Sequence, residues 1–122
     1  MPFEAARVQA ILVDSYSTLL DVDSAADALR SRLENADAVA RLWRAESLNY
    51  TMLCNFYGLY EPFYELNRHA LDFALRAHGV ALPDRERDEI LSIYHHLDVF
   101  PDVRPGLQRL RELGFPIWVL SN

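Results

Sequence analysis

Two short apolar segments, at 8–13 and 115–120, constrain the fold of this chain more than any other feature. The first is brief and rich in β-branched residues, and it stops at Asp14. The second is similarly apolar and is followed by Ser121 and Asn122. Short apolar runs of this kind are typical of strands buried on both faces of a parallel sheet. We therefore expect two buried parallel strands joined by a long crossover connection.

Helical patterns fill most of the sequence between these segments. Apolar residues recur at helical spacing over 37–57, which indicates an amphipathic helix. Pro62 suits the first turn of another helix, and Gly79 suits the cap at its end. Ser24 and Asp102 are the expected starts of two more. The expected helices cover about 24–33, 37–57, 62–78, a stretch from 84 onward, and 102–113.

This order of elements predicts an α/β fold with a helical insertion. We assign 1–21 and 98–122 to a partial Rossmann-like core, and 22–97 to a helical domain inserted after the first strand. Ligands in such sheets bind beyond the carboxyl ends of the strands, where Asp14 and Ser121 are expected. Two parallel strands do not form a stable sheet alone. We therefore expect the chain to be the N-terminal portion of a longer protein, or to find its remaining strands elsewhere.

Composition excludes several classes of protein. The chain has 122 residues, of which 51% are hydrophobic and 25% charged, as expected for one soluble domain. No apolar run approaches the roughly 18 residues of a membrane helix, so no membrane partner is expected. A net charge of −6 argues against nucleic acid as a partner. The single cysteine, Cys54, and the lack of a visible secretory signal predict a cytoplasmic protein.

Three motifs carry a resemblance to a known family. Residues Asp14–Asp21 resemble the first motif of the haloacid dehalogenase superfamily, in particular the Asp-x-Tyr-Gly-Thr-Leu-x-Asp pattern of its L-2-haloacid dehalogenase branch. The stretches 42–44 and 48–51 are similar to the helical cap of that branch, and 120–122 matches its second motif. Ser17 departs from the pattern, which has Gly there. The family's third and fourth motifs, a Lys and a later acidic segment, lie beyond residue 122.

The resemblance implies hydrolytic dehalogenation of a short 2-haloalkanoic acid, with no organic cofactor and no metal. In this interpretation Asp14 is the nucleophile that forms an ester with the substrate. Thr18 holds Asp14 through its hydroxyl group. Arg44, from the helical cap, and Asn122 stabilise the departing halide. The expected catalytic residues are therefore Asp14, Thr18, Arg44 and Asn122.

The same resemblance implies a set of substrate-binding residues. Ser121 binds the substrate carboxylate, and Leu48 and Phe63 line an apolar pocket. Tyr16 is a further expected substrate-binding residue. It occupies the position where phosphatases of the superfamily have a second Asp, which disfavours phosphoryl transfer and its magnesium ion. The branch also implies a homodimer formed through the cap.

Each of these residues also has an ordinary structural interpretation. Asp14 suits the cap of a turn, Thr18 a hydroxyl-bonded turn, and Phe63 a core aromatic. Arg44 is typical of a solvated helix surface. Ser121 and Asn122 are also what an ordinary chain end with incidental polar residues would contain. Two other functions therefore remain open. One is another hydrolase of the superfamily, such as a phosphatase, and the other is a non-catalytic fragment or interaction module.

Three further features predict structure and no function. His95 and His96 are adjacent on a predicted helix, so they point in different directions and do not suggest a metal site. Cys54 lies among apolar residues and is expected to be a small buried side chain. The charged run at 85–89 is expected to be a solvated helix face.

Overall fold

The computed structural model describes residues 7–121, and chain contacts divide it into two compact units. The first unit consists of the described parts of Met1–Val22 and Leu97–Asn122. The second consists of Asp23–His96, which are inserted between the two parts of the first. These limits differ by one residue from the domain limits assigned from the sequence.

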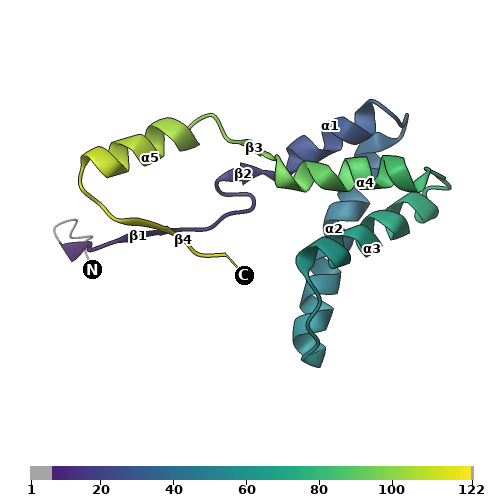
Figure 1. The fold of residues 1–122 in the computed structure, drawn as a ribbon, viewed down its shortest axis with the longest axis horizontal. Helices are drawn as coiled ribbons and strands as arrows, with labels where there is room; N and C mark the ends of the chain where they lie inside the picture. The colour runs from purple at the N-terminus through teal and green to yellow at the C-terminus, as the bar shows by residue number, and fades with distance from the viewer. Residues whose placement is uncertain (1–6, 122) are drawn as a thin grey trace. The chain divides into compact units, whose positions relative to one another are not determined.

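The first unit contains the two strands predicted from the apolar segments. β1 (Ile11–Val13) pairs in parallel with β4 (Ile117–Val119), and the two lie side by side in Figure 1. α5 (Val103–Glu112) leads into β4, so the strands are joined by the expected crossover. The parallel α/β arrangement is confirmed, although each strand is shorter than its apolar segment.

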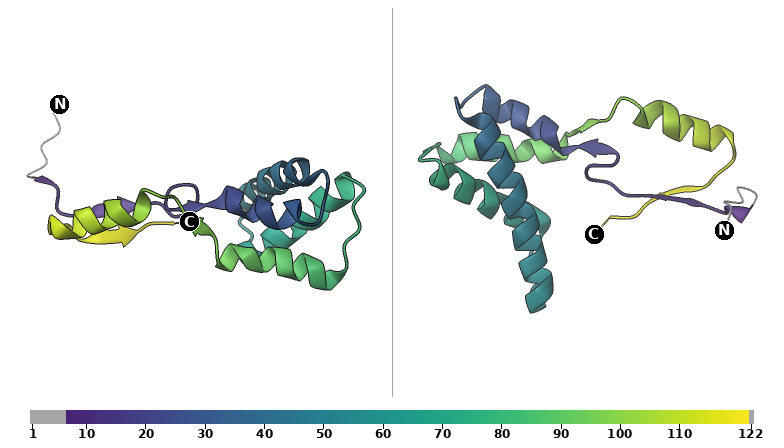
Figure 2. Two further views of the ribbon diagram at one scale, coloured as in Figure 1. Left: turned by 90° about the horizontal axis from the view of Figure 1, so that it is seen from above. Right: turned by 180° about the vertical axis from the view of Figure 1, so that it is seen from behind.

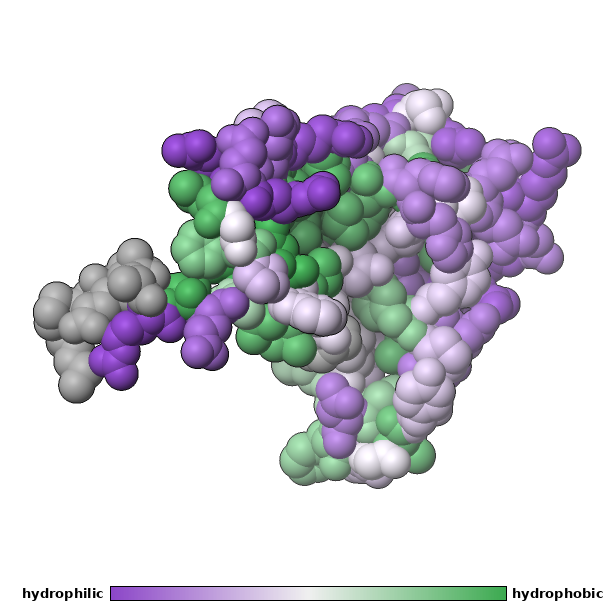
Figure 3. Space-filling model, turned by 60° about the vertical axis from the view of Figure 1, so that its left-hand side comes forward, coloured by the Kyte–Doolittle hydropathy of each residue, from purple (hydrophilic) through white to green (hydrophobic). Residues whose placement is uncertain are grey.

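The prediction that these strands are buried is wrong for this chain. Leu12 of β1 and Trp118 of β4 are 64% and 63% exposed. Val22 is the one buried residue among the described residues of this unit. The reason is geometric, because a sheet of two strands with one helix cannot cover both of its faces. Figure 3 shows hydrophobic side chains open on one face of the molecule.

A second, smaller pairing in this unit was not predicted. β2 (Leu20–Asp21) pairs antiparallel with β3 (Asp98–Val99). The Phe100 amide extends this pairing by donating to the Leu19 carbonyl at 3.3 Å. β2 lies just before the helical insertion and β3 just after it. The two chain segments that lead into and out of the second unit are therefore hydrogen-bonded to each other.

The second unit contains helices and no strand, and the predicted helices are present. The first ends at Arg30, three residues early, and the fourth ends at Ser92, before His95 and His96, which were expected on a helix. Pro62 occupies the N-cap position of the third helix, and Gly58 and Gly79 follow two helices with a φ of 66°, as glycine caps do. Ser24 makes no side-chain cap bond, because a 3₁₀ turn over Val22–Ser24 runs into the first helix. The helices are α1 (Ala25–Arg30), α2 (Ala36–Tyr57), α3 (Phe63–Ala77) and α4 (Asp84–Ser92), followed by the 3₁₀ turn η3 (Ile93–His95).

These helices enclose a hydrophobic core of their own. Trp43 of α2 is its largest member and is 2% exposed. Its ring meets that of Tyr94 edge-on, with 5.2 Å between centroids. Figure 2 shows α1, α3 and α4 grouped around the first half of α2. Burial of each large apolar side chain contributes about 1.5–3 kcal/mol. The other large apolar side chains that are fully buried are Leu29, Val39, Leu71, Ile90 and Leu91.

The second half of α2 differs from the sequence expectation. The apolar spacing over 37–57 continues to the end of the helix, but Leu53 and Tyr57, in its second half, are exposed. Together with their neighbours they form an exposed apolar surface that we call the α2 strip. Its members are Leu48, Met52, Leu53, Phe56, Tyr57, Leu59 and Tyr60.

Ion pairs connect the helices outside this core. Arg87 of α4 pairs with Asp72 of α3 at 2.6 Å and with Asp84 of its own helix. Hydrogen bonds to Asp84 and Asp72 raise the pKa of the Arg87 guanidinium above its ordinary value. Arg87 is also half-buried, whereas the whole run at 85–89 was expected to be a solvated helix face.

Over residues 7–121, no helix is long and apolar enough to span a membrane.

Candidate functional site

The end of β1 places Asp14 beside the end of β4. Val13 is paired with Val119, and the Leu120 amide donates to the Val13 carbonyl at 2.9 Å. Asp14 and Ser121 therefore leave the sheet at the carboxyl ends of neighbouring parallel strands, where ligands bind in α/β folds. Both residues are exposed. Asn122, the other residue predicted at this edge, lies outside the described residues.

The loop after β1 is a tight, hydrogen-bonded turn. The Ser15 carbonyl accepts from the amides of Leu19 at 2.9 Å and Leu20 at 3.1 Å. The Ser17 amide donates to the Leu20 carbonyl at 2.9 Å. Ser17 has a φ of 63°, a left-handed conformation that costs an L-residue about 1–2 kcal/mol. The motif's glycine position is thus one at which a side chain is strained, and this chain has serine there.

Two further predicted site residues lie in this turn. Tyr16 is half-buried and forms an isolated bridge with Leu20. Thr18 is exposed, and its amide donates to the Ser15 carbonyl at 3.3 Å. The turn therefore fixes the backbone of both residues within a few positions of Asp14. The roles of Tyr16 in substrate binding and of Thr18 in holding Asp14 stay predictions.

Arg44 and Leu48 belong to the second unit, on α2. The helix is continuous from Ala36 to Tyr57, so Arg44, Leu48 and Thr51 share one stripe of its surface. Arg44 is half-buried and Leu48 is 49% exposed. A half-buried guanidinium next to an open apolar side chain could receive an anion with an apolar tail. Their contact with a substrate remains a prediction.

Phe63 is the first residue of α3 and is half-buried. Its ring centroid lies 6.1 Å from that of Tyr94, which in turn contacts Trp43. Phe63 is thus attached to an aromatic cluster at the edge of the helical core, as its ordinary structural interpretation expects. The part of the Phe63 ring that stays exposed is the part that would contact a substrate, and this pocket-lining role stays a prediction.

A buried polar contact between α2 and α3 was missed in the sequence. The Ser47 hydroxyl oxygen lies 2.6 Å from Oδ1 of Asn67, and Ser47 and Asn67 are 0% and 1% exposed. Trp43 Nε1 donates to the Asn67 carbonyl at 3.0 Å. A signal was present, because Ser47 follows Trp43 by four residues and so lies on the buried face of the helix.

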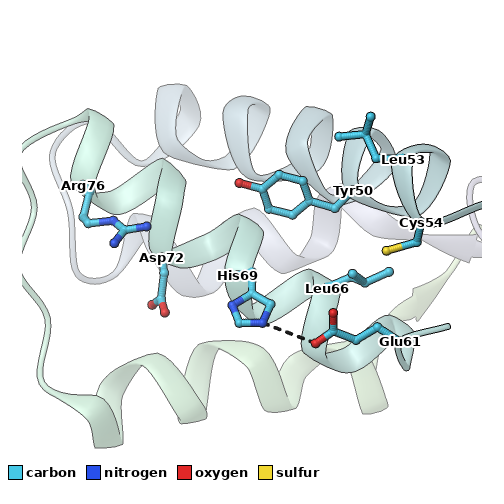
Figure 4. A pocket seen from close by; sticks show the side chains of 8 residues that line it. All are labelled: Tyr50, Leu53, Cys54, Glu61, Leu66, His69, Asp72 and Arg76. Carbon is cyan, nitrogen blue, oxygen red and sulfur yellow. Dashed lines mark ion pairs between the residues drawn. The ribbon is translucent and has the colours of Figure 1, made fainter. Parts of the chain in front are cut away.

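A groove between α2 and α3 is a separate feature of the second unit (Figure 4). It has a volume of about 490 Å³, and His69 pairs with Glu61 at 3.4 Å along it. Cys54 lines the groove and is half-buried, which corrects the expectation of a buried thiol. None of the predicted site residues lines it. The groove residues are Tyr50, Leu53, Cys54, Glu61, Leu66, His69, Asp72 and Arg76.

The structure gives no cluster of metal ligands in its described part. Over residues 7–121, no three His, Cys, Asp or Glu side chains are grouped to hold an ion. His95 instead stacks on Tyr64 of α3, with 5.5 Å between ring centroids and 22° between planes. This contact gives His95 a packing role in the second unit.

A parallel α/β unit with an acid directly after its first strand, interrupted by a helical insertion, is the arrangement of a hydrolase class. The family model for haloacid dehalogenase-like hydrolases matches residues 8–122, and the chain belongs to this family. This confirms the resemblance stated from the three motifs.

Within this family, the curated relatives that the chain resembles include (S)-2-haloacid dehalogenases. The chain is 34% identical over 117 residues to an (S)-2-haloacid dehalogenase from Pseudomonas putida, covering 95% of this chain and 52% of that protein. It is 36% identical over 120 residues to (S)-2-haloacid dehalogenase 4A from Burkholderia cepacia, covering 94% and 50% respectively. The chain thus spans about half the length of these curated relatives.

A solved structure gives the same result for the fold. The L-2-haloacid dehalogenase from Xanthobacter autotrophicus, with chloropropionic acid covalently bound, superimposes with a TM-score of 0.83 at 28% identity. The match covers 93% of this chain and 46% of that one. The fold class predicted from the sequence is therefore confirmed over nearly the whole chain.

Proposed function

We propose that the natural protein removes halide from a short 2-haloalkanoic acid and replaces it with a hydroxyl group. The observation that carries this proposal is the identity of 34–36% to 2-haloacid dehalogenases across nearly the whole chain. The position of Asp14 supports it, because an exposed carboxylate at the end of β1 is open to a small substrate.

In the first step, a carboxylate oxygen of Asp14 attacks C2 of the substrate from the side opposite the halogen. The new C–O bond forms as the carbon–halogen bond breaks, and the halide leaves with the bonding electron pair. Arg44 and Asn122 donate to the developing anion, which is the main electrostatic demand of this step. Ser121 orients the substrate carboxylate, and this contributes by proximity.

In the second step, water attacks the carbonyl carbon of the Asp14 ester. The ester's acyl–oxygen bond breaks, and the 2-hydroxy acid leaves after its alkoxide oxygen takes a proton. The hydroxyl oxygen of the product therefore comes from Asp14, and the water oxygen stays in the carboxylate. The covalent complex named for the Xanthobacter autotrophicus relative supports an intermediate bound to the protein. Neither step requires an organic cofactor or a metal.

The helical unit has two proposed roles around this chemistry. As a cap, it supplies Arg44 together with the apolar side chains Leu48 and Phe63, while Tyr16 contributes from the turn after β1. As an interface, it forms a homodimer through the part of the α2 strip beyond Leu48, from Met52 to Tyr60, because exposed apolar patches of this kind mark association sites. Phosphatase activity is disfavoured, since Tyr16 stands where phosphatases of the superfamily have a second Asp that acts as general acid and base.

The test is halide release from 2-chloropropionate by the natural protein, with its intact mass measured first. We expect Asp14→Asn to lower the rate by about 10³-fold or more, since the nucleophile is lost. Asp102→Asn is the matched control, because Asp102 is an exposed acid of the same unit without a side-chain cap bond. Intact mass before and after the assay checks that the substituted amide has not been hydrolysed back to the carboxylate.

Three results would contradict the proposal in different ways. Sustained halide release by Asp14→Asn would exclude the ester mechanism. Magnesium-dependent hydrolysis of p-nitrophenyl phosphate without halide release would favour a phosphatase. Neither activity in the natural protein would favour a non-catalytic module.

A further inference from the structure

The buried contact between Ser47 and Asn67 is not used by any step described so far. Both side chains are polar and fully enclosed in the core between α2 and α3. The Ser47 hydroxyl also lies 2.9 Å from the Trp43 carbonyl, one turn earlier in α2. Burying a polar group costs free energy unless the group is hydrogen-bonded. Two apolar side chains at this place would avoid that cost, so the polar contact calls for an explanation beyond stability. We call Ser47 and Asn67 the polar pair.

The protons of the polar pair fix how it connects the two helices. A serine hydroxyl has one proton, so Ser47 donates to one of its two neighbouring oxygens at a time. Nδ2 of Asn67 has no partner among the described residues. Rotation of the amide by half a turn would let Nδ2 donate to Ser47 while Ser47 donates to the Trp43 carbonyl. In that arrangement a chain of two hydrogen bonds connects Asn67 of α3 to Ser47 and then to the Trp43 carbonyl of α2.

That turn of α2 is the one that carries Arg44. Trp43 precedes Arg44 directly and is held at both its backbone and its indole, by Ser47 and by the Asn67 carbonyl. Leu48 follows Ser47 directly. Thr51 repeats the pattern one turn later, with its hydroxyl 2.8 Å from the Ser47 carbonyl. Hydroxyl bonds to the carbonyl four residues earlier adjust the curvature of a helix, so this segment is set by side chains as well as by its own backbone.

Apolar packing alone would hold α2 against α3 less specifically. Leucine and alanine surfaces tolerate small rotations and shifts, whereas a buried hydrogen bond fixes one register. A shift of about 1 Å in a group that stabilises a transition state can reduce the rate about 100-fold. The residue best placed to be affected by such a shift is Arg44.

We propose that Ser47 and Asn67 are positioning residues, which set the α2 turn so that Arg44 meets the departing halide. This rests on the proposed function of Arg44. It predicts a specific defect, because chloride is a poorer leaving group than bromide and requires more stabilisation as it departs. Loss of the polar pair should therefore impair reaction with a chloro acid more than with the matching bromo acid.

The experiment measures single-turnover halide release from 2-chloropropionate and 2-bromopropionate by the natural protein. For Ser47→Ala we expect the chloride rate to fall about 10-fold and the ratio of chloride to bromide rates about 3-fold. Asn67→Ala should do the same, and Ser47→Cys, with its weak donor, should be intermediate. Ser92→Ala is the matched control, because the exposed Ser92 at the end of α4 donates to the Glu89 carbonyl and its loss should change neither value.

A merely structural role would give a different result. Partial unfolding lowers the active fraction and so reduces both rates equally, which would leave the ratio unchanged and overturn the proposal. In an Arg44→Ala background, Ser47→Ala should have no further effect on the ratio, because the group that it positions is gone. A further drop in that background would show that Ser47 acts independently of Arg44, which also overturns the proposal.

Arg44→Ala alone separates this inference from the function on which it rests. If that variant leaves the ratio of chloride to bromide rates unchanged, the role of Arg44 at the halide is wrong. If Arg44→Ala lowers the ratio and Ser47→Ala and Asn67→Ala do not, the proposed function stands and the positioning role fails.

Discussion

The two units of this chain differ in how they bury their apolar residues. The helical unit encloses Trp43 and its neighbours almost completely. The strand unit leaves Leu12 and Trp118 mostly open, although its sequence is at least as apolar along the strands. Four helices can enclose a core between them, whereas a parallel strand pair needs further layers on both faces. Apolar sequence therefore predicts a tendency to be buried, and the number of neighbouring elements determines whether burial occurs.

The two tryptophans test this comparison with one substitution. Trp43→Ala should lower the free energy of unfolding by about 3–5 kcal/mol, because it empties a packed site. In this 122-residue chain, Trp118→Ala should change it by no more than about 0.5 kcal/mol, as expected for an exposed position. Urea unfolding followed by helical circular dichroism measures both, since α1 to α4 contain most of the described helical residues.

A graded variant sharpens that result. Trp43→Phe keeps most of the ring volume but loses the indole bond to the Asn67 carbonyl, so we expect a loss of about 1–3 kcal/mol. Equal effects of the alanine substitutions at positions 43 and 118 would contradict the difference between the units.

The left-handed residues give a smaller contrast between the same two units. The helical unit has glycine at each of its left-handed positions, for example Gly79, whereas the strand unit has Gly114 at one such position and Ser17, with a φ of 63°, at the other described one. Ser17→Gly should relieve strain and stabilise the turn by about 1 kcal/mol, and Gly79→Ala should destabilise its helix end by about as much. Hydrogen exchange of the Leu19 and Leu20 amides, which donate to the Ser15 carbonyl, should slow about fivefold in Ser17→Gly. Faster exchange would show that the serine side chain stabilises the turn.

Much of the secondary structure could be predicted because its signals are local. Pro62 and Gly79 mark the limits of α3, and the helical spacing of apolar residues identifies α2. The pairing of β2 with β3 could not be predicted, because each strand has two residues and depends on a partner far away in sequence. The exposure of Trp118 could not be predicted either, because it depends on which other elements cover the sheet.

In the candidate site, too, local signals could be read from the sequence and contacts between distant segments could not. Asp14 and Ser121 could be placed together from sequence, because each follows a strand and parallel strands end at one edge. The polar pair could not, since Ser47 and Asn67 are ordinary surface residues in composition and become a pair only when α2 packs on α3. Strain at Ser17 was foreseen only as a departure from a glycine motif. Its φ of 63° gives that departure a physical meaning.

The most direct test of the proposed mechanism follows an oxygen atom through Asp14. The natural protein, in excess over 2-chloropropionate, is allowed one turnover in water enriched in ¹⁸O. The ester mechanism predicts unlabelled 2-hydroxypropionate and one ¹⁸O atom in the peptide that contains Asp14, both measured by mass spectrometry. Label in the product of this first turnover, with Asp14 unlabelled, would mean that water attacks the substrate directly and would contradict the account.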